Sequence, residues 1–302
     1  MPTPFTLIIP KQIDDSNFSS SNVPENDYAA WSSATTYTLG QYVILGAPYH
    51  KVYQSVNGTG NLNKNPATES TYWVEVSPTN RWKMFDQSGG TITTNAESIV
   101  VTFTASKLTA IAFLDVTCAS IQVTGSYAGT TFYDVTQYGT DQAIINNWYD
   151  YFTAESSRSS ILVFLNVPYV SNATFTVTIS NPGATAACGN MVWGVYQELG
   201  KTQYGATVGI TDYSKKNVDD FGKVTLVQRA FSQKMDAKLY VENTAVDPLR
   251  KTLTGIRATP CLWLGAPDNF ESTTLYGYYK DFSIDIAYPT YSVCSLSLEG
   301  LT

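Results

Sequence analysis

Short segments rich in β-branched and aromatic residues recur roughly every ten residues through the central part of the chain. Residues 98–104, 161–165 and 170–179 are examples, and the last of these ends in strict alternation of polar and apolar residues. Gly, Asn and Ser separate the segments. This spacing is typical of antiparallel sandwiches. The sequence therefore predicts a mainly β fold, with a jelly-roll-like β-sandwich over residues 78–182.

A small aromatic module is predicted over residues 26–77, before the sandwich. Three β-type segments lie in it, at 37–45, 49–54 and 72–76. The module contains no Cys, so its large aromatic side chains must supply its core. Trp31 and Trp73 are the natural centre, because each ring can bury about 150–250 Å².

The two ends of the chain are predicted to serve assembly. Residues 1–25 form an N-terminal arm, in which the apolar residues 6–10 favour a strand docked on a neighbouring sheet over an unstructured terminus. Residues 183–302 form a β-rich C-terminal domain with one helix. Asp247 is its expected N-cap and Pro248 its first helical residue.

The charge of the chain excludes some classes of partner. Only 14% of the 302 residues are charged, and the net charge is −7. A general nucleic-acid binder has a basic face, and an anionic membrane surface repels an acidic protein. The N-terminus does not read as a signal peptide, and no apolar segment is long enough to span a bilayer. We therefore expect synthesis in the cytoplasm, without membrane insertion or nucleic-acid binding.

The cysteine and histidine content disfavours a metal or cofactor site. The four cysteines are widely and irregularly spaced, no C-x-x-C motif occurs, and His50 is the single histidine. The cysteines lie mostly in apolar segments, which favours buried thiols over disulfides. They are Cys118, Cys188, Cys261 and Cys294. The sequence therefore predicts no metal ion and no cofactor.

Catalytic motifs are also missing. His50 is not accompanied by a G-x-S-x-G elbow and is expected to be structural. The Asp-Phe-Gly string at 220–222 lacks the other kinase motifs and is expected to be a turn. Carboxylates that could serve glycoside hydrolysis show no spacing that selects a pair. They are Asp134, Asp141, Asp150 and Glu155. The prediction is a protein that is not an enzyme.

The aromatic module resembles a known family. The spacing of its aromatic, Gly and Pro residues resembles the small chitin- or cellulose-binding modules of bacterial chitinases, which recur in tail and baseplate proteins of bacteriophages. The residues that carry the resemblance are Trp31, Tyr37, Gly40, Val43, Tyr49, Pro66 and Trp73. Sugar-binding members carry exposed aromatics just after the second strand, where this chain has Gln54-Ser55-Val56. The resemblance therefore implies the module's fold more than its ligand.

A second resemblance lies in the last third of the chain. Segments there look like structural proteins of tailed-phage tails and baseplates, at 210–214, 227–232, 257–263 and 279–289. It implies a virion structural protein at the baseplate or tail tip, which assembles with copies of itself and with other tail proteins. The small module could then face a host-surface glycan.

Carbohydrate binding would use the aromatic side chains, since Tyr and Trp suit both sugar stacking and protein interfaces. The candidates are Tyr49, Tyr53, Trp73 and Tyr149. Their placement in alternating segments is equally typical of core and interface residues. An alternative function is therefore a carbohydrate-binding receptor, or an accessory protein of a polysaccharide-degrading system.

Overall fold

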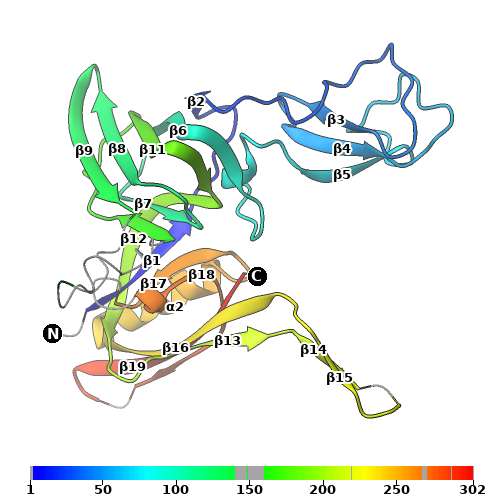
Figure 1. Ribbon diagram of the computed structural model, residues 1–302. Coiled ribbons are helices and arrows are strands. Elements are labelled where there is room, and N and C mark those ends of the chain that lie inside the picture. The colour runs from blue at the N-terminus through cyan, green and yellow to red at the C-terminus, as the bar shows by residue number, and fades with distance from the viewer. Residues whose placement is uncertain are drawn as a thin grey trace. The chain divides into compact units, whose positions relative to one another are not determined.

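The computed structural model describes residues 3–139, 148, 160–218, 220–266, 271–286 and 288–301. The chain divides into two compact units, which are described separately. The terminal unit combines residues 1–11 and 193–302, and the central unit is residues 12–192. The predicted mainly β fold is confirmed: strands dominate both units, and one α-helix lies in the described ranges (Figure 1).

Antiparallel strands form the sheet of the terminal unit, in the order β12-β1-β17-β18-β19-β16-β13. They are β1 (Pro4–Pro10), β12 (Asn190–Thr202, in this unit from residue 193), β13 (Thr207–Asp212), β16 (Phe231–Glu242), β17 (Cys261–Leu264), β18 (Thr274–Asp285) and β19 (Tyr291–Gly300). An additional pairing joins β12 to β16, through Lys201 with Tyr240 and Thr202 with Leu239. This pairing closes six of the strands into a small barrel.

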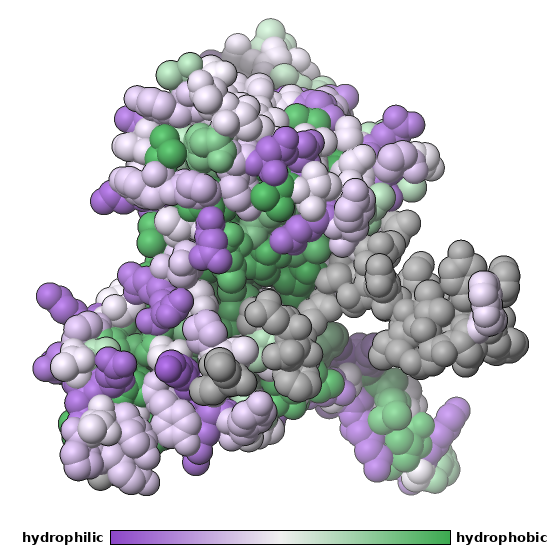
Figure 2. Space-filling model, turned by 90° about the vertical axis from the view of Figure 1, so that its left-hand side faces the viewer, coloured by the Kyte–Doolittle hydropathy of each residue, from purple (hydrophilic) through white to green (hydrophobic). Residues whose placement is uncertain are grey.

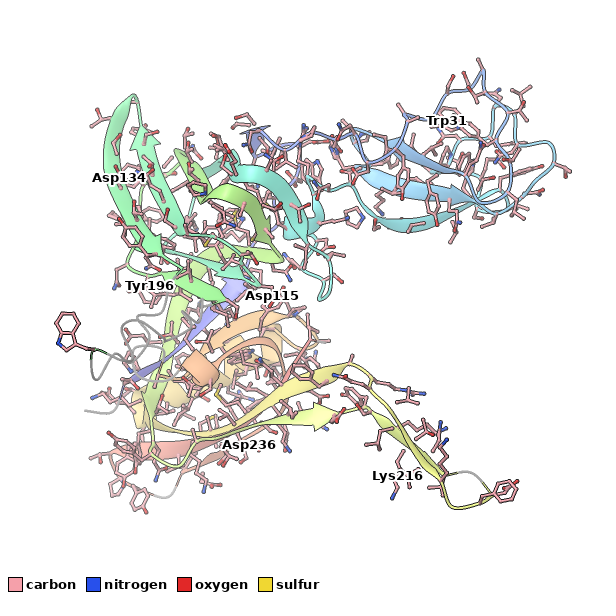
Figure 3. All side chains as sticks on the ribbon, in the orientation of Figure 1. Trp31, Asp115, Asp134, Tyr196, Lys216 and Asp236 are labelled. Carbon is pink, nitrogen blue, oxygen red and sulfur yellow. The ribbon has the colours of Figure 1, made fainter. Side chains whose placement is uncertain are left out.

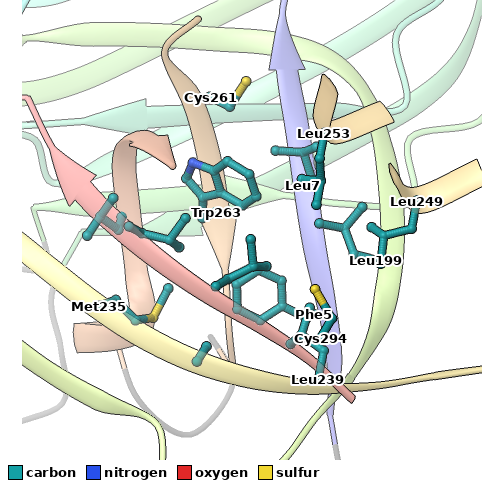
Figure 4. Close-up of a cluster of buried hydrophobic side chains, with 14 of the residues drawn as sticks. Phe5, Leu7, Leu199, Met235, Leu239, Leu249, Leu253, Cys261, Trp263 and Cys294 are labelled. Carbon is teal, nitrogen blue, oxygen red and sulfur yellow. The ribbon is translucent and has the colours of Figure 1, made fainter. Parts of the chain in front are cut away.

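The barrel is filled by apolar side chains because its strands alternate. In β16, Met235, Ala237, Leu239 and Val241 are buried and the residues between them are exposed. Trp263 from β17 and Phe5 from β1 pack in the same cluster (Figure 4), and the Trp263 indole N–H donates to the carbonyl of Gly277 at 3.0 Å.

The predicted helix is present as α2 (Val246–Gly255), and it follows the short 3-10 helix η2 (Asn243–Ala245). Leu249 and Leu253 on one face are buried in the barrel cluster. The N-cap differs from the prediction: it is Ala245, so Asp247 lies in the first turn, where its carboxylate favours the helix dipole. A further 3-10 helix, η3, spans Glu271–Thr273.

The docked strand predicted in the N-terminal arm is present, but it docks on strands of its own chain and not on another subunit. β1 is a strand as predicted, but it pairs with β12 on one side and β17 on the other. Phe5, Leu7 and Ile8 are fully buried. Because β12 occupies one edge of β1 and β17 occupies the other edge at Thr6–Ile8, the strand is docked within its own chain.

The central unit contains a five-stranded antiparallel sheet in the order β2-β6-β11-β8-β9 and a β7–β10 pair. The strands are β2 (Phe18–Ser21), β6 (Thr93–Ala105), β7 (Ala110–Leu114), β8 (Ser120–Tyr127), β9 (Thr130–Tyr138), β10 (Ile161–Phe164) and β11 (Ala173–Cys188). One face of β6, β8 and β11 is buried at alternate residues, as the predicted pattern requires. The outer strand β9 is mostly exposed. Figure 2 shows the side of the molecule on which β9 lies, and hydrophilic and hydrophobic residues are mixed on that side.

The predicted domain boundary at residues 182 and 183 falls inside a strand. β11 continues through Asn181-Pro182-Gly183, and the register with β6 shifts between Ser180 and Thr185. Pro lacks an amide hydrogen, so it is tolerated at such an irregularity. The turn-like residues therefore make a bulge within one strand, and the units divide ten residues later.

The aromatic module has its predicted three strands: β3 (Tyr42–Leu45), β4 (Lys51–Ser55) and β5 (Trp73–Pro78). β4 is central and pairs antiparallel with both neighbours. Residues 37–41 precede β3 as turns and extended chain, and Tyr49 belongs to the turn before β4. The 3-10 helix η1 (Lys83–Phe85) follows β5.

All four cysteines are buried and none forms a disulfide, as predicted. Burial raises the pKa of the Cys261 thiol to about 12 and that of Cys294 to about 11. These thiols are therefore inert in the folded chain near neutral pH.

Candidate functional site

Two of the predicted sugar-binding residues are core residues of the module. Trp73 is 2% exposed and Tyr53 is also buried, both in a cluster with Tyr37 and Val43. The Trp73 indole N–H donates to the carbonyl of Lys64 at 2.9 Å, and the ring meets Tyr37 edge-on with a centroid distance of 5.1 Å. Neither ring has a free face for a sugar, so we leave both out of the candidate site.

Tyr49 is placed differently, because it lies in the turn between β3 and β4. Its amide donates to the carbonyl of Gly46 at 2.9 Å, and its side chain is 45% exposed. The ring is available to a ligand and lines a cleft of the central unit. The fourth predicted residue, Tyr149, lies outside the described residues.

The cleft beside Tyr49 has a volume of about 670 Å³. This size lies within the range of about 300–1,000 Å³ that small-molecule pockets occupy. Aromatic and acidic side chains make up much of its lining, and they include Tyr49, His50, Trp82, Phe85, Asp15 and Glu75. They come from the turn before β4, from β5, from the chain before β2 and from the chain around η1.

His50 joins these segments through two hydrogen bonds. Its Nδ1 lies 2.8 Å from a Glu25 carboxylate oxygen, and its Nε2 lies 2.8 Å from Asp15. A neutral imidazole carries one N–H, so the ring donates both bonds only when both of its nitrogens are protonated. The ring also stacks on Trp82 at 4.2 Å. This arrangement agrees with the prediction of a structural histidine.

Glu25 is tied further into the same network. The Thr79 hydroxyl donates to it at 2.7 Å, and Arg81 lies 3.4 Å from its other oxygen. The two distances of 2.8 Å between the His50 ring nitrogens and the carboxylate oxygens are typical of hydrogen bonds. Among the residues that the structure describes, no group of three or more His, Cys, Asp or Glu side chains is spaced to hold a metal ion.

The cleft offers chemistry suited to a polyhydroxylated ligand. The exposed face of Tyr49 can stack on a sugar ring, and carboxylates accept hydrogen bonds from hydroxyl groups. Lys51 also lines the cleft and forms a 2.7 Å ion pair with Glu75, so the lining includes a cationic donor. The indole N–H of Trp82 is buried without a hydrogen-bond partner in the described structure.

A second aromatic feature of the module was missed by the sequence analysis. Tyr28 and Tyr42 are both exposed, and their rings stack at 4.9 Å with an interplanar angle of 18°. Tyr42 is the cross-strand neighbour of Gln54, which is in turn the neighbour of Val74. The exposed face of the module thus carries an aromatic pair, an amide and an apolar side chain. The alternation of Tyr42 with the buried Val43 was the signal for it.

A different kind of surface lies in the terminal unit. β14 (Lys215–Val218) and β15 (Val224–Val227) form a separate two-stranded sheet beyond the ends of β13 and β16 (Figure 1). Every residue of both strands is exposed, and Leu226 is 76% exposed. The Asp-Phe-Gly string at 220–222 lies between the two strands. Its first two residues, Asp220 and Phe221, form a turn, as predicted.

The carboxylates considered for glycoside hydrolysis do not form a described pair. Asp134 lies on β9 (Figure 3), where it accepts a hydrogen bond from the Gln122 side chain at 2.8 Å. The other three, Asp141, Asp150 and Glu155, lie outside the described residues. No helix in the described ranges combines the length and apolar character needed to cross a membrane.

Neither of two sequence comparisons with known proteins yields a relative. A scan against protein-family models finds no match to this chain, and a search of curated proteins finds no significant similarity. The functional conclusion therefore depends on the residues and geometry described above.

Proposed function

We propose that the chain is a structural protein of a tailed-phage virion, located at the baseplate or tail tip, and that it acts by protein–protein assembly. Copies of the chain and other tail proteins are its partners. The small aromatic module is presented towards the host surface, where it can meet a glycan. In this proposal the protein is not an enzyme and uses no cofactor.

The observation that carries the proposal is the exposed β14–β15 hairpin. An isolated two-stranded hairpin is marginally stable in water at best. This one has apolar residues on both strands, among them Val218, Val224 and Leu226, and no strand of the described chain pairs with either outer edge. A hairpin of this composition is stabilised when a partner covers it, as happens in an assembly.

The test uses purified particles of the phage that encodes the chain. Gold-conjugated antibody raised against residues 26–77 should label the tail tip of intact particles. Antibody raised against the hairpin, residues 213–230, should label only dissociated particles, because the partner covers its epitope. Absence of the chain from the protein content of the particles would refute the proposal.

A carbohydrate-binding receptor or accessory protein is the second candidate. The stacked pair of Tyr28 and Tyr42, and the exposed ring of Tyr49 at the cleft, favour it because exposed tyrosines are suited to stacking on sugars. The two surfaces make separate predictions, so each can be tested by a single substitution.

Binding to insoluble chitin and cellulose distinguishes the two candidates. Tyr42→Ala and Tyr49→Ala are compared with Tyr127→Ala, which removes an exposed tyrosine of β8 outside the module. Loss of retention with either module variant, and not with the control, supports carbohydrate binding. Equal retention of all three variants and the unmodified chain refutes a role for these rings.

A further inference from the structure

The β14–β15 hairpin has two faces of different character. Cross-strand partners are Lys215 with Val227, Lys216 with Leu226, Asn217 with Thr225 and Val218 with Val224. Because side chains alternate between the faces of a strand, one face carries Val218, Val224 and Leu226 together with Lys216. The other carries Lys215, Asn217, Thr225 and Val227. The first is an apolar face with a basic end, and all of its residues are exposed.

The charge of the two hairpin strands is opposite to the net charge of the whole chain, and the turn between them contains Asp220. β14 carries Lys215 and Lys216, of which Lys216 is labelled in Figure 3, and neither strand contains an acidic residue. The complete chain has a net charge of −7. A surface that is complementary to this face in hydrophobicity and charge must be apolar and carry acidic groups. A second copy of this chain meets the charge requirement, because the chain as a whole is acidic.

The barrel of the terminal unit has such a surface where it opens. β12 and β16 are paired only through Lys201 with Tyr240 and Thr202 with Leu239. On one side of this short contact the strands separate, and a groove of about 790 Å³ lies between residues 198–200 and residues 241–242. In this stretch β12 uses one edge for β1, and β16 uses one edge for β19. The edges that face the groove have no strand partner in the described structure.

The lining of the groove complements the hairpin. Tyr240, Tyr291, Leu199 and Val241 give it an apolar floor and walls, and the acidic residues Glu198 and Glu242 are exposed beside one cation, Lys201. Tyr291 meets Tyr240 edge-on at 5.4 Å. Tyrosine is enriched in interface cores. An apolar strand carrying lysine can therefore bury its side chains against the tyrosines and pair its charge with the glutamates.

We propose that the β14–β15 hairpin of one copy seats in the groove between β12 and β16 of a second copy, where it adds strands to the open edges of the barrel. The inference rests on the assembly function proposed above and names its partner. Hairpin and groove are different surfaces, so the contact is heterologous, and repetition builds a ring or a filament. Main-chain hydrogen bonds supply affinity, and the alternate side chains supply specificity.

Cysteine crosslinking in co-expressed, differently tagged full-length chains tests the proposal. One chain carries Leu226→Cys on the hairpin, and the other carries Tyr240→Cys in the groove. The four native cysteines are buried, so a short bismaleimide reacts with the introduced thiols alone. We expect a crosslinked dimer containing both tags. Lys280→Cys, on β18 and outside the groove, replaces Tyr240→Cys as the control and should give no dimer.

Charge exchange provides the second arm. Lys216→Glu should lower the yield of the Leu226–Tyr240 crosslink at least tenfold, and Glu242→Lys in the accepting chain should restore it. A yield unchanged by Lys216→Glu would overturn the charge argument. Circular dichroism of each variant establishes that the barrel is folded.

Two outcomes overturn the proposed contact. Crosslinking of Leu226→Cys with itself in the absence of the groove variant would indicate a symmetric hairpin–hairpin contact. No crosslink in any combination would mean that another protein covers the hairpin. Neither result affects the location of the chain at the tail tip, which the antibody experiment measures separately.

Discussion

Replacing Trp73 by Ala should unfold the aromatic module while the rest of the chain remains folded. The ring is 2% exposed and is central to a core whose other buried members are Tyr37, Val43 and Tyr53. Truncating a buried Trp to Ala costs about 3–5 kcal/mol. The hydrogen bond to Lys64 and the edge-on contact with Tyr37 each add roughly 0.5–1.5 kcal/mol.

This loss is comparable to the whole stability of the module. At about 0.05–0.15 kcal/mol per residue, a module of about 50 residues is stable by roughly 3–8 kcal/mol. The substitution removes roughly 4–8 kcal/mol when its contributions are added. The folded module therefore ceases to be the dominant state in Trp73→Ala, since no other large core contact compensates.

Hydrogen–deuterium exchange of the full chain measures this change. The amides of β4 should lose their protection in Trp73→Ala, and those of β16 in the terminal unit should keep theirs. Tyr42→Ala is the matched control, because it removes an exposed ring of the same sheet and should leave β4 protected. Protection of β4 in Trp73→Ala equal to that of the unmodified chain would refute the assignment of Trp73 to the core.

Three further predictions concern other parts of the chain. Gly277→Ala should destabilise the barrel by about 1–3 kcal/mol, because its Cβ would overlap the carbonyl oxygen of Glu299. Denaturant unfolding should show a lower midpoint for this variant. The control Gly255→Ala should leave the midpoint unchanged, because its Cβ meets nothing within 4 Å. Iodoacetamide at pH 8 should leave the buried cysteines unmodified in the native chain and label all four in denaturant, because burial raises the pKa of thiols such as Cys261; labelling of the native chain would contradict this. Hydrogen bonds from the neighbouring Ser16 lower the pKa of Asp14 below its usual 3.8, so the contribution of this carboxylate to stability is complete above pH 3.8 and is lost as the pH falls through the lowered pKa. The difference in unfolding free energy between the unmodified chain and Asp14→Asn should therefore shrink in acid. A difference that grows in acid would contradict this prediction.

The secondary structure of the module could be predicted because its residues alternate, but the roles of its aromatics could not. Tyr53 and Trp73 were named as ligand candidates, and the structure uses both for the core. A strand pattern states which residues share a face but not which face is buried. Tyr28 and Tyr42 meet through a contact between β3 and a residue outside the predicted strands, and no local pattern reports such a contact.

Strand β16 carries its own signal in the sequence. Its sequence, FSQKMDAKLYVE, alternates apolar and polar residues from Met235 to Val241, so the signal was present. Four of its polar residues are charged, namely Lys234, Asp236, Lys238 and Glu242. The domain boundary failed for a related reason: Asn181-Pro182-Gly183 has turn chemistry, but long-range pairing of β11 with β6 on both sides of it overrides the local preference.

The position at which a hydrophobic core ends is the feature that a sequence predicts least well. The function proposed for this chain depends on that position in the barrel. On β16, the face that buries Met235 continues to Gln233 and Phe231, which are exposed. On β13, Ile210 lies opposite Gln233 and is 56% exposed. The alternating pattern therefore runs past the last residue that the barrel covers, and the hairpin beyond it exposes the apolar side chains of Val218, Val224 and Leu226. An alternation of this kind looks the same in the sequence whether the chain's own core or another molecule buries it. Only the length of the strands relative to the barrel distinguishes the two, and this comparison is the reason that we propose the apolar face of the hairpin as an interface.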